Sequence, residues 1–443
     1  MPISIRHTPV RADGGVRFEA VRSRSMWATV FLTASIVGRL LWVLLSTNGA
    51  NFVDLHVYRD GAAGIADGSL YSYAYDGPTA TPLPFTYPPF AAVVFYPLSL
   101  LPWDVVAIGW QFATIAALYA SVVLTLRLCG RTGSCYPLAA TWTAAGLWCE
   151  PVRVTLDYGQ INVFLMLGAL FAVTIARTRM GLVAGGALIG LMAGIKLTPA
   201  ISGLWYLAVR RPLGAVAAAA GFAATVAGCL IFFPGVTRTY FDDLLGDADR
   251  IGEPELVMNQ SLRGALSRMT GHDVGSGWVW LAAVAVALVL AVVAWRSVDG
   301  DWLAVLLVVQ LLGLLVSPIS WVHHWVWLVP LAIWLAHGPG TERRWSRAVL
   351  AGWIAVGAIG VPWLLRLADQ FEVSVAPAVT AVGGAVWPAL ALVTMVWLAA
   401  TRPRATGYAA DVPLAESPAE SRSRSSGVAP LSLRSAAYRS TYC

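Results

Sequence analysis

The stretch LLWVLLSTNGANFVDLHVYRDGA (residues 40–62) joins a strongly apolar run to a short polar segment. The apolar run begins near residue 27 and therefore has about the length of 20 residues that a membrane-crossing helix needs. The polar segment then places two carboxylates, Asp54 and Asp60, directly after that helix, with His56 and Arg59 between them. Ionisable groups at the mouth of a membrane helix are costly, so they point to a function or to a fixed charge partner.

The composition is that of a polytopic membrane protein. Hydrophobic residues make up 58% of the chain, charged residues 12%, and the mean hydropathy is +0.67. The net charge of +6 is spread over short loops and the termini, which does not favour a nucleic-acid partner. Five cysteines show no CxxC pair and no zinc-like Cys/His spacing, so neither a disulfide framework nor a structural metal site is expected.

The two ends of the chain differ from its centre. Residues 1–25 are basic and polar, and no small-residue cleavage site ends the apolar run that follows, which favours a retained first helix. The tail, residues 401–443, is rich in Ser, Ala, Pro and Arg, and we expect it to be disordered and cytoplasmic. We therefore predict a cytoplasmic N-terminal segment, a transmembrane domain over 26–400, and a disordered tail.

The apolar segments predict an all-α membrane domain with about twelve transmembrane helices. Several segments are shorter than the roughly 20 residues of a perpendicular span. They include the two passes, 182–196 and 198–209, into which we divide residues 182–209. The run 88–103 is interrupted by prolines and predicts a partial helix. The candidate spans are 27–46, 105–126, 136–149, 160–176, 182–196, 198–209, 213–233, 277–295, 302–316, 321–336, 346–365 and 377–400.

The distribution of Lys and Arg predicts the topology, because short basic loops face the cytoplasm. With both termini inside, the basic loops 127–131, 176–181, 209–214, 295–301 and 341–347 all fall on the cytoplasmic side. The other side then receives the polar segments 51–87, 149–162, 194–199, 234–276, 317–325 and 367–373. This asymmetry predicts a site on the outer surface, with short amphipathic helices in the first outer loop. A lipid-linked sugar transporter or flippase is the alternative, but no repeat or pair of broken helices supports it.

Six motifs in a fixed order carry a resemblance to a known family. They are VDLHVY (53–58), FTYPPFAAVVFYPL (85–98), DYGQINV (157–163), GIKLTPAI (194–201), NQSLRGA (259–265) and LVSPISWVHHWVWLVPL (315–331). Together they resemble the polyprenyl-phosphate-mannose-dependent α-1,2-mannosyltransferases, membrane glycosyltransferases of the GT-C class, and most of all the branch that builds phosphatidylinositol mannosides. The likeness covers about residues 25 to 400.

The resemblance implies a reaction at the outer face of the cytoplasmic membrane. Mannose would pass from polyprenyl phosphate mannose to a 2-hydroxyl of a phosphatidylinositol mannoside, with inversion, forming an α-1,2 bond. Branching of lipomannan or lipoarabinomannan is a related alternative. Such a transfer needs one general base and stabilisation of the leaving phosphate. No cofactor is expected beyond the lipid-linked donor, and no metal, because Asp54 and Asp60 are too far apart for a DxD pair.

Asp54 matches the family's catalytic aspartate and is our candidate for the base. A position in the first turn of a helix favours its ionised form, although it could also merely cap that helix. Asp60 follows six residues later and points to another face, so we expect it to be solvated or paired with an arginine.

Several cations and hydrogen-bonding groups are candidates for holding the substrates. The candidates for binding the leaving phosphate are Lys196, Arg59, His323 and His324. Lys196 could instead reach the lipid headgroups. Of the two adjacent histidines, only one is expected to face a given cavity. His324 is slightly favoured. The candidates for sugar binding are His56, Tyr58, Glu150, Asp157, Tyr158, Gln160, Asn162, Asn259, Gln260 and Ser320, some of which could instead cap helices. The LPFTYPPF cluster (83–90) is expected to form a wall without chemistry.

Overall fold

The computed structural model describes residues 13–45, 50–77, 82–131, 135–247 and 249–401. The predicted tail from residue 402 onward and the first twelve residues lie outside this part. Within it, α1 already begins at Asp13, so the predicted boundary between residues 25 and 26 falls inside one continuous helix.

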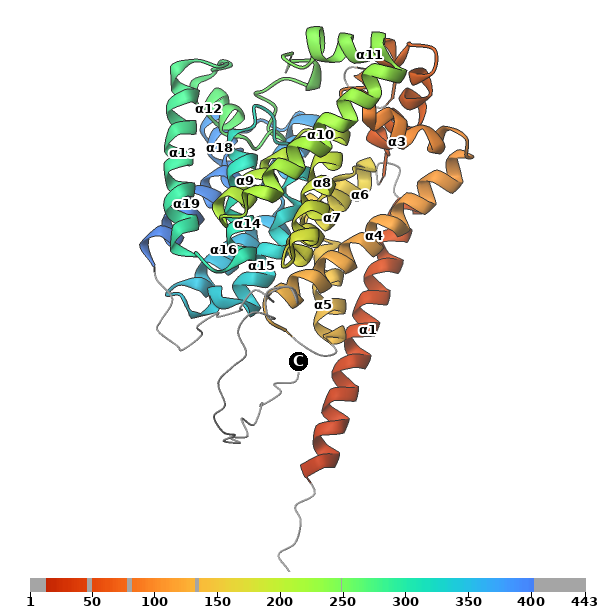
Figure 1. Ribbon diagram of the computed structural model, residues 1–443. Coiled ribbons are helices and arrows are strands. Elements are labelled where there is room, and N and C mark those ends of the chain that lie inside the picture. Colours follow the sequence, from red (N-terminus) through yellow and green to blue (C-terminus); the bar gives the residue numbers. More distant parts are fainter. Residues whose placement is uncertain (1–12, 46–49, 78–81, 132–134, 248, 402–443) are drawn as a thin grey trace, which may run out of the picture.

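Apart from two very short strands, the regular elements of the described chain are all helices (Figure 1). The α-helices are α1 Asp13–Leu45, α2 Val53–His56, α3 Pro89–Ser99, α4 Trp103–Leu128, α5 Tyr136–Gly146, α6 Glu150–Tyr158, α7 Asn162–Ile175, α8 Arg179–Ile195, α9 Ser202–Ala208, α10 Pro212–Phe232, α11 Pro234–Arg238, α12 Leu262–Thr270, α13 Trp278–Ser297, α14 Trp302–Val316, α15 Leu328–His337, α16 Ser346–Ile359, α17 Val361–Gln370, α18 Pro377–Gly383 and α19 Val386–Ala400. The π-helices are η1 Val57–Gly61 and η5 Thr239–Leu244. The 3₁₀ helices are η2 Ala63–Ile65, η3 Leu70–Ser72, η4 Thr198–Ile201, η6 Asp249–Ile251, η7 Val322–Trp327 and η8 Pro339–Glu342. Strands β1 Ala74–Tyr75 and β2 Leu83–Pro84 pair antiparallel, with Tyr75 opposite Leu83.

Long apolar helices identify the chain as a multi-pass membrane protein. Among the described residues, 5 helical segments are long and apolar enough to cross a membrane, or up to 7 if each of two bent helix pairs counts as one span. Helices α3, α8 and α14 are apolar but shorter. The predicted span at 198–209 is divided between η4 and α9, and neither piece is long enough to cross a bilayer alone.

Contacts between loops bring basic segments together at one end of the bundle. Arg210 lies 3.4 Å from the carboxylate of Asp299, which joins the loop before α10 to the loop after α13. Arg343 donates to the carbonyl of Ser297 at 2.5 Å and to that of Leu398 at 3.1 Å. Residues 53–77 and 82–99 lie at the upper end in Figure 1, together with α11 and α12.

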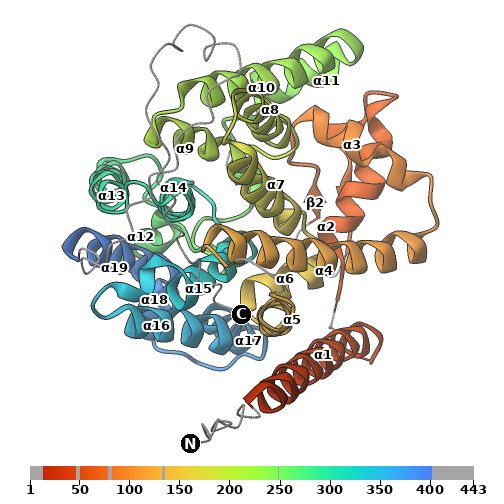
Figure 2. The same cartoon turned by 60° about the horizontal axis from the view of Figure 1, so that its bottom comes forward.

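Helix α6 is a buried element where the sequence indicated an outer loop over 149–162. It is amphipathic, and it meets α7 at an angle of 120°. Asp157 near its end lies 2.6 Å from Arg39 of α1 and 3.2 Å from Arg153, and the side chains of Arg39 and Asp157 are almost fully buried. A buried carboxylate needs such partners, because leaving a charge unpaired in the interior is strongly destabilising. The pair fixes α6 to α1, which lies at the rim of the bundle beside α5 (Figure 2).

The end of α6 also positions α2, the helix that carries Asp54. The amide of Phe52 donates to the carbonyl of Asp157 at 2.9 Å. Gly159 then ends α6 in the left-handed conformation, with φ of 71°. A Cβ at Gly159 would lie 2.6 Å from the Cβ of Leu55, so only glycine permits this approach of α2 to α6.

We predict that Gly159→Ala destabilises the protein by about 1–3 kcal/mol, the usual cost of a non-glycine residue held in a rare backbone conformation. The added methyl group also pushes α2 away from α6. Thermal unfolding in detergent micelles should show a lower midpoint than in the wild type. Gly109→Ala is the matched control, because Gly109 lies in α4 and a Cβ there meets nothing within 4 Å. Equal midpoints for the two variants would contradict the proposed constraint.

Candidate functional site

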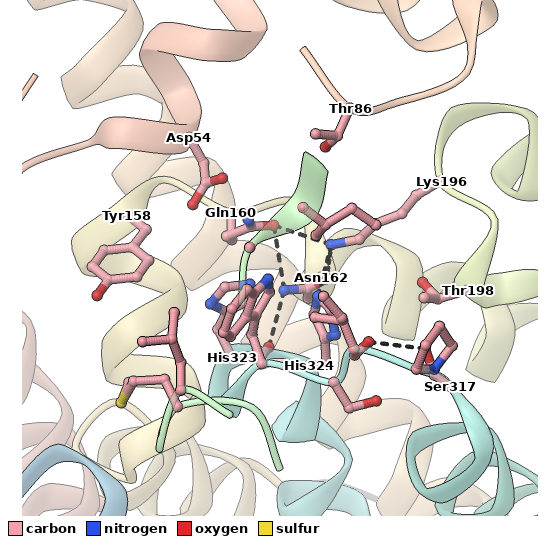
Figure 3. Close-up of a pocket in the computed structure, with 18 of the residues that line it drawn as sticks. Asp54, Thr86, Tyr158, Gln160, Asn162, Lys196, Thr198, Ser317, His323 and His324 are labelled. Carbon is pink, nitrogen blue, oxygen red and sulfur yellow. Dashed lines mark hydrogen bonds between the residues drawn. The ribbon is translucent and has the colours of Figure 1, made fainter. Parts of the chain in front are cut away.

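A cavity of about 1400 Å³ brings polar side chains from separate segments together. Eight of the fifteen predicted site residues line it, namely Asp54, Tyr158, Gln160, Asn162, Lys196, Ser320, His323 and His324. They come from α2, from the junction of α6 and α7, from the residue after α8, and from η7 with the residues before it. Figure 3 shows Asp54 on one side of this group and Lys196 on the other, with Gln160 between them.

Asp54 is the second residue of α2, as the sequence indicated. Burial raises the pKa of its carboxyl group above the ordinary value, while a hydrogen bond from Gln160 and the positive charge of Lys196 act to lower it. Arg59 and His56, which the sequence suggested as its neighbours, are occupied elsewhere. The cation that acts on Asp54 is therefore Lys196, which is 142 residues away in the sequence.

The ammonium group of Lys196 is buried and has three neutral hydrogen-bond acceptors. Its Nζ lies 3.2 Å from Gln160 Oε1, 2.9 Å from Asn162 Oδ1 and 3.2 Å from His324 Nε2. Burial lowers the pKa of Lys196, and the negative charge of Asp54 raises it again. Because an ammonium group has three N–H donors, an anion that enters this site must replace one of the three acceptors.

Both histidines of η7 line the cavity, whereas the sequence suggested that only one would do so. The tight 3₁₀ geometry of η7 places the two rings 4.8 Å apart at 82° to each other. Both rings share the cavity with the ammonium group of Lys196, which disfavours a second positive charge on either imidazole. They are therefore better suited to act as neutral hydrogen-bonding groups than as the cations that the sequence suggested. Since His324 Nε2 accepts from Lys196, the proton of that ring lies on Nδ1.

Tyr87 belongs to the FTYPPF motif, to which the sequence assigned no chemistry, yet it lines the cavity. Its hydroxyl group lies 3.0 Å from that of Tyr58, and Gln160 Nε2 donates to it at 3.4 Å. Its ring also lies 5.5 Å from Lys196 Nζ, so its π face can stabilise the cation. Tyr58 itself is fully buried behind the wall and donates to Gln160 Oε1 at 2.9 Å, so it orients Gln160 without facing the cavity.

Of the four ionisable side chains at residues 54, 56, 59 and 60, only that of Asp54 lines the cavity. His56 stacks on Trp103 at a ring distance of 3.6 Å, and its Nδ1 lies 3.2 Å from Asp60. Arg59 forms an ion pair with Asp60 and donates to the carbonyl of Leu101 at 3.0 Å. None of these three side chains lines the cavity, which corrects the expectation that His56 and Arg59 contact the substrate. The expected pairing of Asp60 with an arginine agrees with the structure.

Four more predicted binding residues bond to other parts of the protein and do not line the cavity. Glu150 accepts from the amide of Trp363 at 2.9 Å and from the indole of Trp387 at 3.3 Å. Asp157 is held by its two arginines, as described above. Asn259 accepts from the amide of Ser320 at 2.9 Å, and Gln260 donates to the carbonyl of Gly384 at 2.6 Å. These groups fix α6 and the loop before η7, so their polar atoms are not directed at a ligand.

Other lining residues were not predicted from the sequence. They are Thr86, Thr198, Ser317 and Arg366 among others, and Arg366 of α17 donates to the hydroxyl group of Tyr158. The signal that could have identified Arg366 is its position directly after the apolar residues 361–365, where a charged side chain is costly unless it has a partner. No group of three or more His, Cys, Asp or Glu side chains with the geometry of a metal site occurs in the described part of the chain.

The arrangement joins a carboxylate and an ammonium group across one cavity. The carboxylate of Asp54 can accept a proton from a hydroxyl group that enters between them. The ammonium group of Lys196 can stabilise negative charge on the opposite side, where its low-dielectric surroundings strengthen the interaction. Amide, tyrosine and neutral imidazole groups around them are suited to sugar hydroxyls.

Comparison with known proteins agrees with this chemistry. Residues 85–318 match the model of glycosyltransferase family 87. A polyprenol-phosphate-mannose-dependent alpha-(1-2)-phosphatidylinositol pentamannoside mannosyltransferase of Mycobacterium tuberculosis is 50% identical over 379 residues, which cover 84% of this chain and 87% of that protein. The protein of the same description from Mycolicibacterium smegmatis is 49% identical, over 85% of this chain and 92% of its own length.

A third relative is more distant. It is a polyprenol-phosphate-mannose-dependent alpha-(1-2)-phosphatidylinositol mannoside mannosyltransferase of Mycobacterium tuberculosis, 32% identical over 85% of this chain and 92% of its own length. No solved structure matches the chain. The family match and the extent of these alignments favour a transferase over the transporter considered from the sequence. The chain belongs to glycosyltransferase family 87.

Proposed function

We propose that the protein transfers mannose from polyprenyl phosphate mannose to a 2-hydroxyl group of a phosphatidylinositol mannoside and forms an α-1,2 linkage. The observation that carries this proposal is the placement of Asp54 and Lys196 across one cavity, with neutral sugar-binding groups between them. A pentamannoside is the acceptor we favour, because the two relatives near 50% identity carry that acceptor in their names and the relative at 32% does not.

The reaction is a single displacement with inversion. The acceptor oxygen forms a bond to the anomeric carbon of mannose, and the bond from that carbon to the phosphate oxygen breaks. Asp54 takes the proton of the acceptor hydroxyl group, and the departing polyprenyl phosphate keeps the electron pair. A protonated side chain for the leaving group is unnecessary, because a phosphate monoester is already a good leaving group.

Lys196 stabilises the charge that grows on the leaving phosphate. All three of its donors are used, by Gln160, Asn162 and His324. The two amides are fixed by further hydrogen bonds, since Asn162 donates to the carbonyl of His323 at 3.0 Å and Gln160 accepts from Tyr58. Within the part of the chain that the structure describes, Nδ1 of His324 has no hydrogen-bond partner. His324 is therefore the acceptor that phosphate replaces, and its Nδ1–H is then free to donate to substrate.

The membrane arrangement is part of the proposal. We propose a GT-C fold with about twelve transmembrane helices, in which the shorter apolar helices α8 and α14 are among the spans and the short helices of the first outer loop lie on the outer surface. Both termini lie in the cytoplasm, and the cavity opens to the outer side. The arginine-rich loops that meet around Arg210 and Arg343 support this orientation.

Labelling of single cysteines in a cysteine-free background tests the orientation. A membrane-impermeant maleimide applied to intact cells should label Ser69→Cys, because Ser69 is exposed in the segment between α2 and α3, which we place on the outer side. Thr341→Cys, which is exposed among the basic loops, should react only after the membrane is permeabilised. The reverse pattern would place the cavity in the cytoplasm and contradict the proposal.

Asp54→Asn should lower mannose transfer by about 10²–10⁴-fold, the usual contribution of a general base. The amide keeps the size of the carboxylate but cannot take the proton, so donor binding should persist. The assay measures transfer from polyprenyl phosphate mannose to a pentamannoside acceptor, with the product analysed by mass. Asp60→Asn is the matched control, because Asp60 lies outside the cavity and should leave the rate nearly unchanged. Near wild-type transfer by Asp54→Asn would rule out its role as base.

The dependence of turnover on pH should have two limbs. Transfer should fall in acid as Asp54 becomes protonated, at a pH above the ordinary aspartate pKa of about 3.9, because burial raises the pKa of Asp54. It should fall in alkali as Lys196 loses its proton, below the ordinary lysine pKa of about 10.4, because burial lowers the pKa of Lys196.

Lys196→Met separates the two limbs. Loss of the cation should lower turnover by about 10²–10³-fold, as for other electrostatic stabilisers of a transition state. It should also abolish the alkaline limb and move the acid limb to higher pH, because the Lys196 charge lowers the pKa of Asp54. Arg59→Met, which removes a cation outside the cavity, should leave both limbs in place. An acid limb that does not move in Lys196→Met would show that the two groups are not coupled.

A further inference from the structure

A second, smaller hollow opens between the membrane helices α7 and α8. It measures about 410 Å³, and the residues of the described chain that line it are all apolar. We name it the α7–α8 hollow and define it by its lining residues, Ile161, Phe164, Leu165, Leu167, Gly168, Phe171, Leu188, Met192 and Ile195. Apolar cavities do not hold ordered water, so this lining is suited to an apolar ligand.

The packing of α8 keeps this hollow open. Figure 2 shows α8 between α7 and α10. On the side of α10 the contact is so close that a Cβ at Gly190 would lie 2.2 Å from the carbonyl oxygen of Ala218. On the other side α8 approaches α7 at Gly185, where a Cβ would lie 3.0 Å from the carbonyl oxygen of Ala172. Closing the hollow would draw α8 away from α10 and lose the packing of small residues that stabilises helix pairs in membranes.

The α7–α8 hollow is open to the bilayer at one end and buried at the other. Phe171 is 46% exposed, and on a membrane helix such a side chain faces lipid. Ile161 and Met192 are each less than a tenth exposed. The ten residues from Ile161 to Phe171 correspond to roughly 15 Å at about 1.5 Å of rise per residue. This length is about half of the 30 Å hydrocarbon core of a bilayer, which is the depth that the chains of one leaflet fill.

The buried end of the hollow adjoins the residues that hold Lys196. Ile161 lies directly between Gln160 and Asn162, which are two of the three acceptors of the ammonium group. Ile195 directly precedes Lys196 in the chain. Pressure on the lining at this end is therefore passed to the backbone of Lys196 and of its acceptors.

Met192 makes the same connection through a backbone hydrogen bond. The amide of Lys196 donates to the carbonyl group of Met192 at 2.9 Å. The side chain of Met192 lies between the two helices, because a Cβ at Gly168 would be 2.3 Å from its sulfur atom. Methionine is unbranched and adapts to the space around it, so its side chain can turn into an empty hollow. A ligand in the hollow would hold Met192 in place, and with it the end of α8 that carries Lys196.

We propose that the α7–α8 hollow binds one acyl chain of a bilayer phospholipid, and that this chain holds Lys196 and its acceptors in the arrangement used for transfer. An acyl chain fits because the hollow is apolar, is open to the bilayer and has the length of a chain in one leaflet. The effect on transfer rests on the proposed function, since it takes Lys196 to stabilise the leaving phosphate. The binding of the chain does not depend on that function.

Photolabelling tests the binding on the wild-type, full-length protein in nanodiscs of phosphatidylglycerol. A small fraction of the lipid carries a diazirine near the end of one acyl chain, and the labelled peptides are identified by mass. Peptides of α7 and α8 should be labelled several-fold more than those of α13, most of which is exposed. Equal labelling of the three helices would show ordinary contact with the bilayer and would overturn the proposal. So would loss of the α7 and α8 labelling on addition of geranylgeranyl phosphate, because the hollow would then belong to the donor.

The length of the added acyl chain tests the effect on transfer. The protein is stripped of lipid in micelles of a cholate-type detergent, whose rigid ring system is too wide for a hollow of one chain. Phosphatidylglycerols of increasing chain length are then added. Turnover of the wild type should rise about tenfold and level off once the hollow is full, since a displacement of 1 Å near the reacting groups can alone cost about 10²-fold.

Leu188→Trp fills the α7–α8 hollow and should lose this gain from chain length. Leu281→Trp is the matched control, because the same substitution there enlarges a side chain of α13 that is already 54% exposed. It should retain the full gain. An equal gain in Leu188→Trp and in the wild type would overturn the proposal. Photolabelling of the wild type needs no variant, so it decides the binding even if Leu188→Trp does not fold.

Lys196→Met shows whether the chain acts through Lys196. Two changes that act through the same group are not additive, so the residual transfer of this variant should no longer respond to chain length. A full response would show that the lipid acts on the fold in general and would overturn the proposed effect on Lys196. If the wild type transfers no mannose with any lipid, the proposed function fails, while the photolabelling still decides whether the chain binds.

Discussion

The burial of one ammonium group organises this site. A lysine side chain inside a protein loses its hydration, and it stays charged only if hydrogen-bond acceptors and a counter-charge replace the lost water. Lys196 finds three acceptors on two separate segments, the junction of α6 and α7 and the helix η7. The counter-charge comes from a third segment, in Asp54 of α2. The positions of all three segments are therefore tied to one cation.

That arrangement in turn requires the sharp bend between α6 and α7. The bend turns the chain by 120°, so that Gln160 and Asn162 point toward Lys196 while α6 stays buried beside α1. Asp157 holds α6 through Arg39, and its carbonyl group holds the start of α2 through Phe52. Gly159 allows α2 to come close enough for Asp54 to reach the cavity. The carboxylate of Asp54 is thus positioned by backbone contacts and by an ion pair that does not itself line the cavity.

Periodicity and charge predicted the larger features, since long apolar runs and clustered arginines report directly on burial in a membrane. The apolar runs over 27–46, 105–126 and 213–233 correspond to α1, α4 and α10. The sequence could not show which polar residues near the outer loops face the cavity. Glu150 and Asp157 looked like sugar ligands because 149–162 read as a loop, whereas α6 is a buried helix whose carboxylates pair with the protein. Tyr87 was missed because the prolines and aromatic residues around it suggested only a rigid wall, whereas its side chain lines the cavity.

The most direct test of this account is a structure of the protein with polyprenyl phosphate bound. The account predicts a phosphate oxygen within hydrogen-bond distance of Lys196 Nζ, with His324 Nε2 no longer accepting from that group and Asp54 on the opposite side of the cavity. A phosphate bound at Arg366 or Arg250 instead, with Lys196 still bonded to Gln160, Asn162 and His324, would contradict it.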